Sequence, residues 1–167
     1  MSCLQTLIVE KEIPFPALVS IIHRTHHIML NSVMKSFGLS AGQFLIMVHL
    51  SKEQGITQDS LARHFHIDKA SIARHVKKLE DSGYIKRITD PENRRAFSLY
   101  LTQKGEDIVP SLIGADKKIE EAACLGLSKE ETDSLYSMLL RIAKNSLNIV
   151  TDSGEEYYAE KWIKKFE

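Results

Sequence analysis

The sequence has few of the features that mark secreted, membrane and metal-binding proteins. Only two of its 167 residues are cysteine, Cys3 and Cys124, and they form no CxxC pair. So few thiols suit a reducing compartment, and we expect a cytoplasmic location. No apolar run approaches the roughly 20 residues of a membrane helix, and residues 1–11 lack the basic start and long apolar core of a secretory signal. We therefore expect no membrane partner.

The common catalytic motifs are missing as well. The sequence holds no GxSxG, no phosphate-binding loop, no GxGxxG and no HExxH. Its serines, histidines and aspartates show no spacing that predicts a catalytic triad. We expect neither an enzyme nor a bound cofactor, so the function has to be sought in binding.

The chain also lacks an excess of charge of either sign, because 22 basic residues balance 22 acidic ones. Their distribution is uneven. Residues 57–104 hold ten Lys or Arg against six Asp or Glu, which leaves the rest of the chain with 12 basic and 16 acidic residues. A basic centre between acidic ends is a local electrostatic signal for phosphate, and the zero sum hides it.

The N-terminal region, residues 1–38, predicts a long helix that begins near Phe15 and ends at Gly38. Leu18, Ile22 and Met29 fall close to helical spacing, and further apolar residues widen this stripe. Such a wide apolar face is typical of a helix that is buried on more than one side. We therefore expect residues 1–38 to form a dimerisation helix.

Residues 39–103 predict a DNA-binding domain of the winged helix-turn-helix type. Ser40, Thr57 and Asp68 each stand where an N-cap is needed, so three helices should follow, the first with Gln43 as capping-box partner. Gly83 suits the left-handed end of the third helix. Two short strands with period-2 patterning should then enclose the turn-rich residues 90–93. The fold class is thus mainly α with a small β-hairpin wing, flanked by N- and C-terminal dimerisation helices.

The helix that follows Asp68 should present a basic face to the major groove of DNA. Ile72, Val76 and Leu79 form its inward stripe, and the outer face is polar. Because the start of such a helix enters the groove deepest, the first residues should meet base edges and later ones should meet phosphate. The candidates for base contact are Lys69, Ala70, Ser71 and Arg74, followed by His75 on the same face and by Lys77 and Lys78 for phosphate.

The expected wing carries Arg94 and Arg95 on a loop with no core to serve. A narrow minor groove attracts an inserted arginine by its negative potential, and Asp90 could steer that arginine by an ion pair. The alternative is that the basic helix and the loop are only solvated charged surface.

These segments together resemble the MarR family of transcriptional regulators. The resemblance rests on Ile67-Asp68-Lys69-Ala70-Ser71, Leu79-Glu80-Asp81-Ser82-Gly83-Tyr84-Ile85, the wing with Asp90 and Asn93-Arg94-Arg95, and Leu101-Thr102-Gln103-Lys104-Gly105. It implies a homodimer that binds double-stranded DNA. Arg94 would then enter the minor groove, and Asp90 would hold the Arg94 side chain in place. Ala70 and Ala73 depart from the Ser or Thr that members often carry, which removes two hydrogen-bonding groups.

Residues 104–150 predict C-terminal dimerisation helices. The first should run to about Cys124 with a break or kink near Pro110 and Gly114, and the second carries a long apolar stripe from Leu135 to Val150. One small winged domain cannot cover all these apolar faces, so a second copy should, and two-fold symmetry then predicts a palindromic operator. Residues 151–167 form an extension of unknown role, with aromatic residues at Tyr158, Trp162 and Phe166 that could pack on the partner.

The resemblance also implies regulation, most simply repression that is released by a small anionic aromatic effector. Arg87 matches a position that can offer an arginine to a ligand carboxylate, and His23 or Arg24 could assist from the first helix. Arg87 could instead be a solvated or phosphate-contacting strand residue.

Three alternatives remain open. His23 and His27 have the i, i+4 spacing of two metal ligands, with His26 between them, although no Cys, Asp or Glu on that helix completes a site, and we expect no metal. Cys3 or Cys124 could sense oxidants, although neither has the basic setting of a reactive thiol. The winged domain could also bind protein or RNA in place of DNA.

Overall fold

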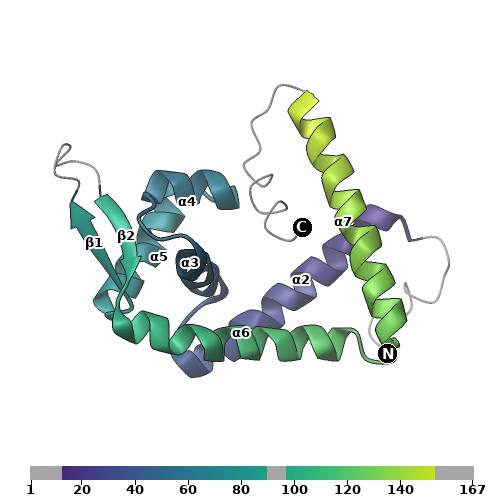
Figure 1. The fold of residues 1–167 in the computed structure, drawn as a ribbon, viewed down its shortest axis with the longest axis horizontal. Coiled ribbons are helices and arrows are strands. Elements are labelled where there is room, and N and C mark those ends of the chain that lie inside the picture. Colours follow the sequence, from purple (N-terminus) through teal and green to yellow (C-terminus); the bar gives the residue numbers. More distant parts are fainter. Residues whose placement is uncertain (1–12, 90–96, 153–167) are drawn as a thin grey trace.

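The structure is a computed structural model that describes residues 13–89 and 97–152. A lobe at one end joins three long helices at the other (Figure 1). In chain order the elements are α2 (Phe15–Met34), the 3₁₀ turn η1 (Lys35–Phe37), α3 (Ala41–Lys52), α4 (Gln58–Phe65), α5 (Lys69–Asp81), β1 (Ile85–Thr89), β2 (Phe97–Leu101), α6 (Gln103–Ala123) and α7 (Lys129–Asp152). The expected fold class, mainly helical with a β-hairpin wing, is confirmed.

Several residues singled out from the sequence lie outside the described part of the chain. They are Cys3, the wing residues Asp90, Arg94 and Arg95, and the C-terminal aromatic residues Tyr158, Trp162 and Phe166.

Side-chain caps fix where the helices of the lobe begin. The Ser40 hydroxyl accepts a hydrogen bond from the Gln43 N–H at 3.4 Å, while Gln43 Oε1 accepts one from the Ser40 N–H at 2.9 Å. Thr57 caps α4 through the Ser60 N–H, and Asp68 caps α5 through the Ser71 N–H at 2.8 Å. These bonds satisfy N–H groups that have no partner within their own helix. The capping residues expected from the sequence are therefore confirmed.

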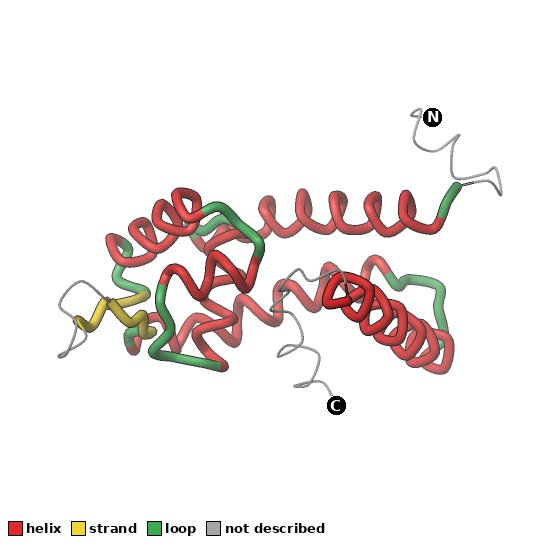
Figure 2. Tube along the Cα trace, turned by 90° about the horizontal axis from the view of Figure 1, so that it is seen from above, coloured by secondary structure: helices red, strands yellow, loops and turns green. Residues whose placement is uncertain are grey.

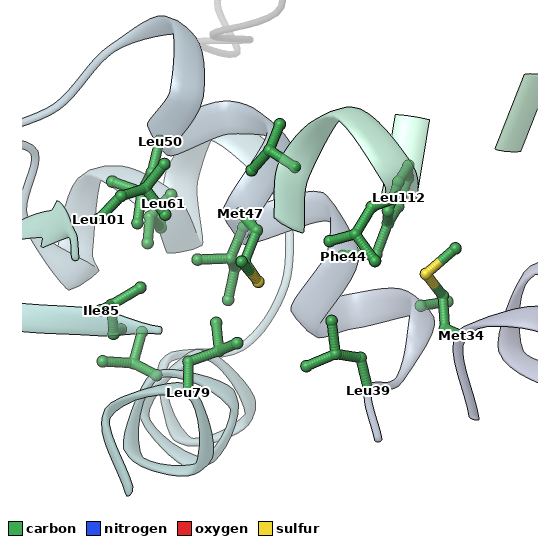
Figure 3. Close-up of a cluster of buried hydrophobic side chains, with 14 of the residues drawn as sticks. Met34, Leu39, Phe44, Met47, Leu50, Leu61, Leu79, Ile85, Leu101 and Leu112 are labelled. Atoms are coloured by element: carbon green, nitrogen blue, oxygen red, sulfur yellow. The ribbon is translucent and has the colours of Figure 1, made fainter. Parts of the chain in front are cut away.

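The core of the lobe forms where α3 lies between the end of α2, the inner face of α5, the hairpin and the first half of α6 (Figure 3). Met47 of α3 is fully buried at its centre, with Leu79 of α5 and Leu101 of β2 packed around it. Met34 and Leu112 extend the same core toward the long helices, so one continuous core fixes both α5 and α6.

The hairpin pairs β1 with β2 in antiparallel register, with Ile85 opposite Leu101 and Thr89 opposite Phe97. The segment after α3 joins its other edge, because the Gly55 N–H donates to the Leu99 carbonyl at 2.9 Å and Ile56 forms a bridge with Leu99. Strand β2 is thus bonded to β1 along one edge and to the segment after α3 along the other, and this second contact anchors the wing to the lobe.

Helix α6 connects the lobe to the long helices. It runs without interruption through Pro110 and Gly114, so the break expected there is absent. Pro110 is exposed, whereas Val109 and Leu112 on either side are buried in the core, and this packing holds the helix together across the missing N–H. Further along, Asp116 Oδ1 lies 3.0 Å from His26 Nε2 of α2, which ties these two helices together.

Helices α2 and α7 cross in Figure 1, but Figure 2 shows that they lie apart. Within the described residues, α7 forms no extensive packing with another element. Of the described helices none is by itself long and apolar enough to cross a membrane, and only the pair made of Phe15–Phe37 and Ala41–Lys52, bent by 79°, meets the length and composition criteria.

Gly105, at the start of α6, is required by a close approach to the backbone of the hairpin. A Cβ built there would lie 2.1 Å from the Tyr84 carbonyl oxygen. Replacing Gly105 with Ala should therefore lower the free energy of unfolding by about 1–3 kcal/mol, the usual cost of overpacking. Urea denaturation followed by circular dichroism would measure this loss.

The matched control is Gly114→Ala in the same helix. A Cβ at Gly114 meets nothing within 4 Å, and alanine is favoured over glycine inside a helix by about 1 kcal/mol. That variant should be as stable as the parent or slightly more so. Equal stability of the two variants would show that the approach of Gly105 to Tyr84 carries no strain.

Candidate nucleic-acid interface

Helix α5 separates its residues into an apolar face and a basic face. Ile72, Val76 and Leu79 are fully buried, as the sequence predicts. Lys69, Ala70, Arg74, Lys77 and Lys78 are exposed. Because the three buried residues lock the rotation of the helix, the basic side chains have to face away from the lobe.

The start of the basic face is ordered by short hydrogen bonds. Arg74 Nη2 donates to the Ser71 hydroxyl at 2.6 Å, and Ser71 itself is half-buried. Hydrogen bonds from the Ser71 hydroxyl and N–H keep the pKa of Asp68 below its ordinary value, so this cap is charged at neutral pH. The Arg74 guanidinium is thereby presented next to the first turn of α5.

Acidic side chains pair with two of the basic ones. Lys69 Nζ lies 3.1 Å from Asp59 Oδ1 of α4, and Lys77 Nζ contacts Asp81 Oδ1 one turn along α5. Among the described residues no carboxylate forms an ion pair with Arg74 or Lys78. The positive charge available to an anion is therefore concentrated at these two positions.

His75 lies at the edge of the contact between α5 and α3 rather than fully on the outer face. A Cβ built at Gly42 of α3 would lie only 2.4 Å from Cε1 of the His75 ring, so the ring sits directly against this glycine. Its Nδ1 is buried and has no hydrogen-bond partner in the described structure. Burial, followed by the charges of Lys78 and Arg74, lowers the pKa of His75.

Arg87 braces the wing against α5. Its Nε lies 3.2 Å from Glu80 Oε2, although the angle does not suit a hydrogen bond, and its guanidinium carbon lies 6.0 Å from the centre of the Phe97 ring. The other effector candidates, on α2, have their own partners. His23 stacks on His27 with ring centres 6.4 Å apart, and Arg24 Nε donates to the Ser20 carbonyl at 3.4 Å. No described hydrogen bond or ion pair joins Arg87 to His23 or Arg24.

The described residues contain no group of three or more His, Cys, Asp or Glu side chains placed to hold a metal ion. His26 is paired with Asp116, on a different helix from its neighbours in sequence. Cys124 is a half-buried free thiol at the end of α6.

Two of the acidic partners at this surface could not be predicted from the sequence. Asp59 lies on α4 whereas Lys69 starts α5, and Glu80 lies on α5 whereas Arg87 lies on β1. No spacing rule for a single helix or strand links such pairs. The contact of His75 with Gly42 could not be predicted either, because it joins two different helices, α5 and α3.

Comparisons with known proteins agree on one family. Residues 39–97 match the sequence profile of the MarR family. The chain is similar to the helix-turn-helix transcriptional regulator YybA of Bacillus subtilis, with 32% identity over 76% of this chain and 85% of that one. A crystal structure of MarR superposes with a TM-score of 0.79 at 33% identity, covering 86% of this chain and 98% of the other.

A further solved structure shows a relative with its nucleic acid. It is a MarR family regulator of Listeria monocytogenes in complex with a 26-mer DNA, with a TM-score of 0.71 and 25% identity over 86% of this chain and 97% of the other.

The environment of His75 makes stability depend on pH. Since its pKa in the folded lobe lies below the ordinary value of 6.5, the unfolded chain binds a proton first when the pH falls below about 6.5. The free energy of unfolding should therefore decrease from pH 6.5 downward until the lowered pKa is passed. In His75→Gln this decrease should be smaller.

Urea denaturation of the parent and of His75→Gln at pH 7.5 and pH 5.5 would measure how much stability each protein loses between the two pH values. Subtracting the loss in the variant from the loss in the parent removes the contributions of the other histidines. An equal loss of stability in the variant and the parent would contradict the assignment to His75.

Proposed function

The chain belongs to the MarR family of DNA-binding transcriptional regulators, and we propose that it acts as a homodimeric repressor on a palindromic operator. Helix α5 is the element that enters the major groove. The observation that carries this proposal is the division of α5 into a fully buried apolar face and an exposed basic one. The Listeria relative, solved in complex with a 26-mer DNA, supports DNA as the partner.

Within this proposal the residues of α5 have different roles. Arg74 is about one turn from the start of the helix and pairs with no carboxylate among the described residues, which suits bidentate contact with a guanine. Lys69, Ala70 and Ser71 precede it and face the base edges, while Lys77 and Lys78 reach phosphates. His75 supports α5 against α3. Asp90, Arg94 and Arg95, outside the described residues, complete the interface by the wing.

The dimer is proposed from apolar side chains that the single chain leaves in water. Ile22 and Ile28 of α2 are 63% and 68% exposed, and Ile149 of α7 is 71% exposed. Further exposed apolar residues on the same two helices are Phe15, Leu18, Val19, Met29, Met138, Leu139 and Ile142. An apolar surface spread over two long helices is typical of a protein interface. A second copy, related by two-fold symmetry, would cover it.

Two-fold symmetry explains why the operator should be palindromic. Each copy of α5 reads one half-site, and the half-sites lie about 34–36 Å apart along one face of the duplex.

The proposed sign of regulation is repression. A dimer that occupies two successive major grooves blocks other proteins from the same DNA, and we therefore favour repression. A reporter fused to the operator promoter should be more active in cells that lack the protein.

An effector remains part of the proposal on the strength of the family resemblance. A small aromatic carboxylate would meet Arg87 by displacing Glu80, its ion-pair partner at 3.2 Å, or would meet His23 and Arg24 on α2. Loosening the contact of Glu80 with Arg87 would change how the wing is held relative to α5. Adding aromatic carboxylates to the DNA-binding assay tests this route.

Replacing Arg74 with Ala should reduce operator affinity by roughly 5- to 150-fold, which corresponds to the 1–3 kcal/mol of one good base contact. Fluorescence anisotropy with duplexes from upstream of the protein's own gene would measure this. An unrelated duplex of equal length is the control for specificity. Arg94→Ala, at a residue outside the described part, belongs in the same series.

The matched variant is Lys77→Ala on the same helix. Because a phosphate contact carries no sequence information, this change should weaken binding to both duplexes alike. Equal losses on both duplexes for Arg74→Ala would show that Arg74 does not read bases.

Replacing Leu139 with Asp on α7 should dissociate the dimer, because it places a charge in the proposed apolar interface. Sedimentation should then report the 18.9 kDa of one chain in place of twice that mass. Operator affinity should fall by roughly 10²-fold or more, since linking two binding sites raises affinity by about 10²–10⁴-fold. Asn145→Asp, which adds the same charge at an exposed polar site of α7, should change neither quantity. A parent protein that sediments as a single chain would refute the dimer.

A further inference from the structure

A groove of about 450 Å³ lies between the start of α3, the end of α5 and η1. Lys35 stands on the η1 side and Lys78 on the α5 side, with Ser40 and Gln43 of α3 and Asp81 of α5 also in its lining. We call this the α3–α5 groove. It lies apart from the base-reading start of α5, and of its lining residues only Lys78 has so far been given a role, in contact with phosphate.

The groove carries net positive charge. Lys35 and Lys78 are both exposed, and neither has an acidic partner among the described residues. The one carboxylate in the lining, Asp81, is already paired with Lys77. Two unpaired ammonium groups on opposite sides of one groove favour an anion between them.

Gln43 adds a directed hydrogen-bond donor. Its side chain is only 5% exposed, and Oε1 accepts hydrogen bonds from the Ser40 N–H at 2.9 Å and the Ser40 hydroxyl at 3.0 Å. Because a backbone N–H must meet an acceptor, this contact fixes which end of the amide carries oxygen. The Nε2 amino group then has no acceptor in the described structure, in a residue that lines the groove.

The start of α3 contributes through its dipole. Its first N–H groups are already used, since the Ala41 N–H donates to Asn31 Oδ1 at 2.9 Å and the Gln43 N–H donates to the Ser40 hydroxyl. The partial positive charge of the helix start remains and favours an anion nearby. A bound anion would therefore be held by Lys35, Lys78 and the Gln43 amide within this field.

We propose that the α3–α5 groove binds a backbone phosphate of the DNA, held by Lys35, Lys78 and the Gln43 amide. This rests on the proposed function, in which α5 lies in the major groove. Lys78 is one turn beyond Arg74 on α5, so it reaches the DNA backbone at the edge of the major groove that Arg74 enters. Lys35 extends the contact from α5 to the end of α2, an element outside the helix-turn-helix.

The test measures DNA binding of Lys35→Gln as a function of salt. Each phosphate contact that is lost reduces the slope of log affinity against log salt by about 1, whatever the sequence. We expect that reduction, with an equal loss of affinity on the operator and on an unrelated duplex. The double variant with Lys78→Gln should lower the slope by about 2. Lys118→Gln, the same charge change on an exposed residue of α6, should leave the slope unchanged.

A second arm uses inorganic phosphate alone, followed by NMR of the Gln43 side-chain amide in the full-length protein. Shifts that depend on Lys35, together with the reduced salt slope, support the proposal. Shifts without any change in the salt slope would show that the groove binds a free anion and not a DNA phosphate, which would overturn the proposal. If neither shifts nor a change in slope are observed, the groove is not an anion site. If the parent protein binds no duplex at all, the proposed function fails, and the phosphate titration still decides whether the groove takes phosphate.

Discussion

The burial of Ile72, Val76 and Leu79 is the constraint on which the rest of the structure depends. These side chains meet the same core that holds α3, the hairpin and the first half of α6. Rotating α5 by half a turn would place three apolar residues in water, at a cost of roughly 1.5–3 kcal/mol each, and would bury Arg74 and Lys78 without partners. The direction of the basic face is therefore decided by apolar packing, and the charges themselves have no part in setting it.

The same core would link DNA binding to the proposed dimerisation, because α6 belongs to both the lobe and the long helices. Leu112 is fully buried in the core of the lobe, and one turn later Asp116 is paired with His26 of α2. In the proposed dimer, a change in how two copies of α2 and α7 pack would thus be transmitted along a continuous helix to the lobe. Because Pro110 does not interrupt α6, the helix can act as a rigid connection between the proposed dimer interface and the lobe that carries α5.

The elements of the fold could be predicted from the sequence wherever local rules decide them. Ser40, Thr57 and Asp68 start their helices as expected, because a cap acts within four residues. The break expected near Pro110 is absent, because the buried residues on either side of it hold the helix together. His75 could not be oriented and the groove at Lys35 could not be seen, because both depend on how α3 packs against α5, which no single-element periodicity describes.

The acidic residues within the basic region have a physical consequence for DNA binding. Asp59 and Asp81 pair with Lys69 and Lys77 at exposed positions, where an ion pair adds about 0–1 kcal/mol to stability. Exchanging these weak partners for phosphate therefore costs little, yet their charge still opposes every phosphate that approaches. That opposition weakens binding to any duplex, whereas the proposed contact of Arg74 with a base would be gained only on the right sequence. A chain with zero net charge could in this way keep non-specific binding low while retaining the contacts that the proposed function assigns to its operator.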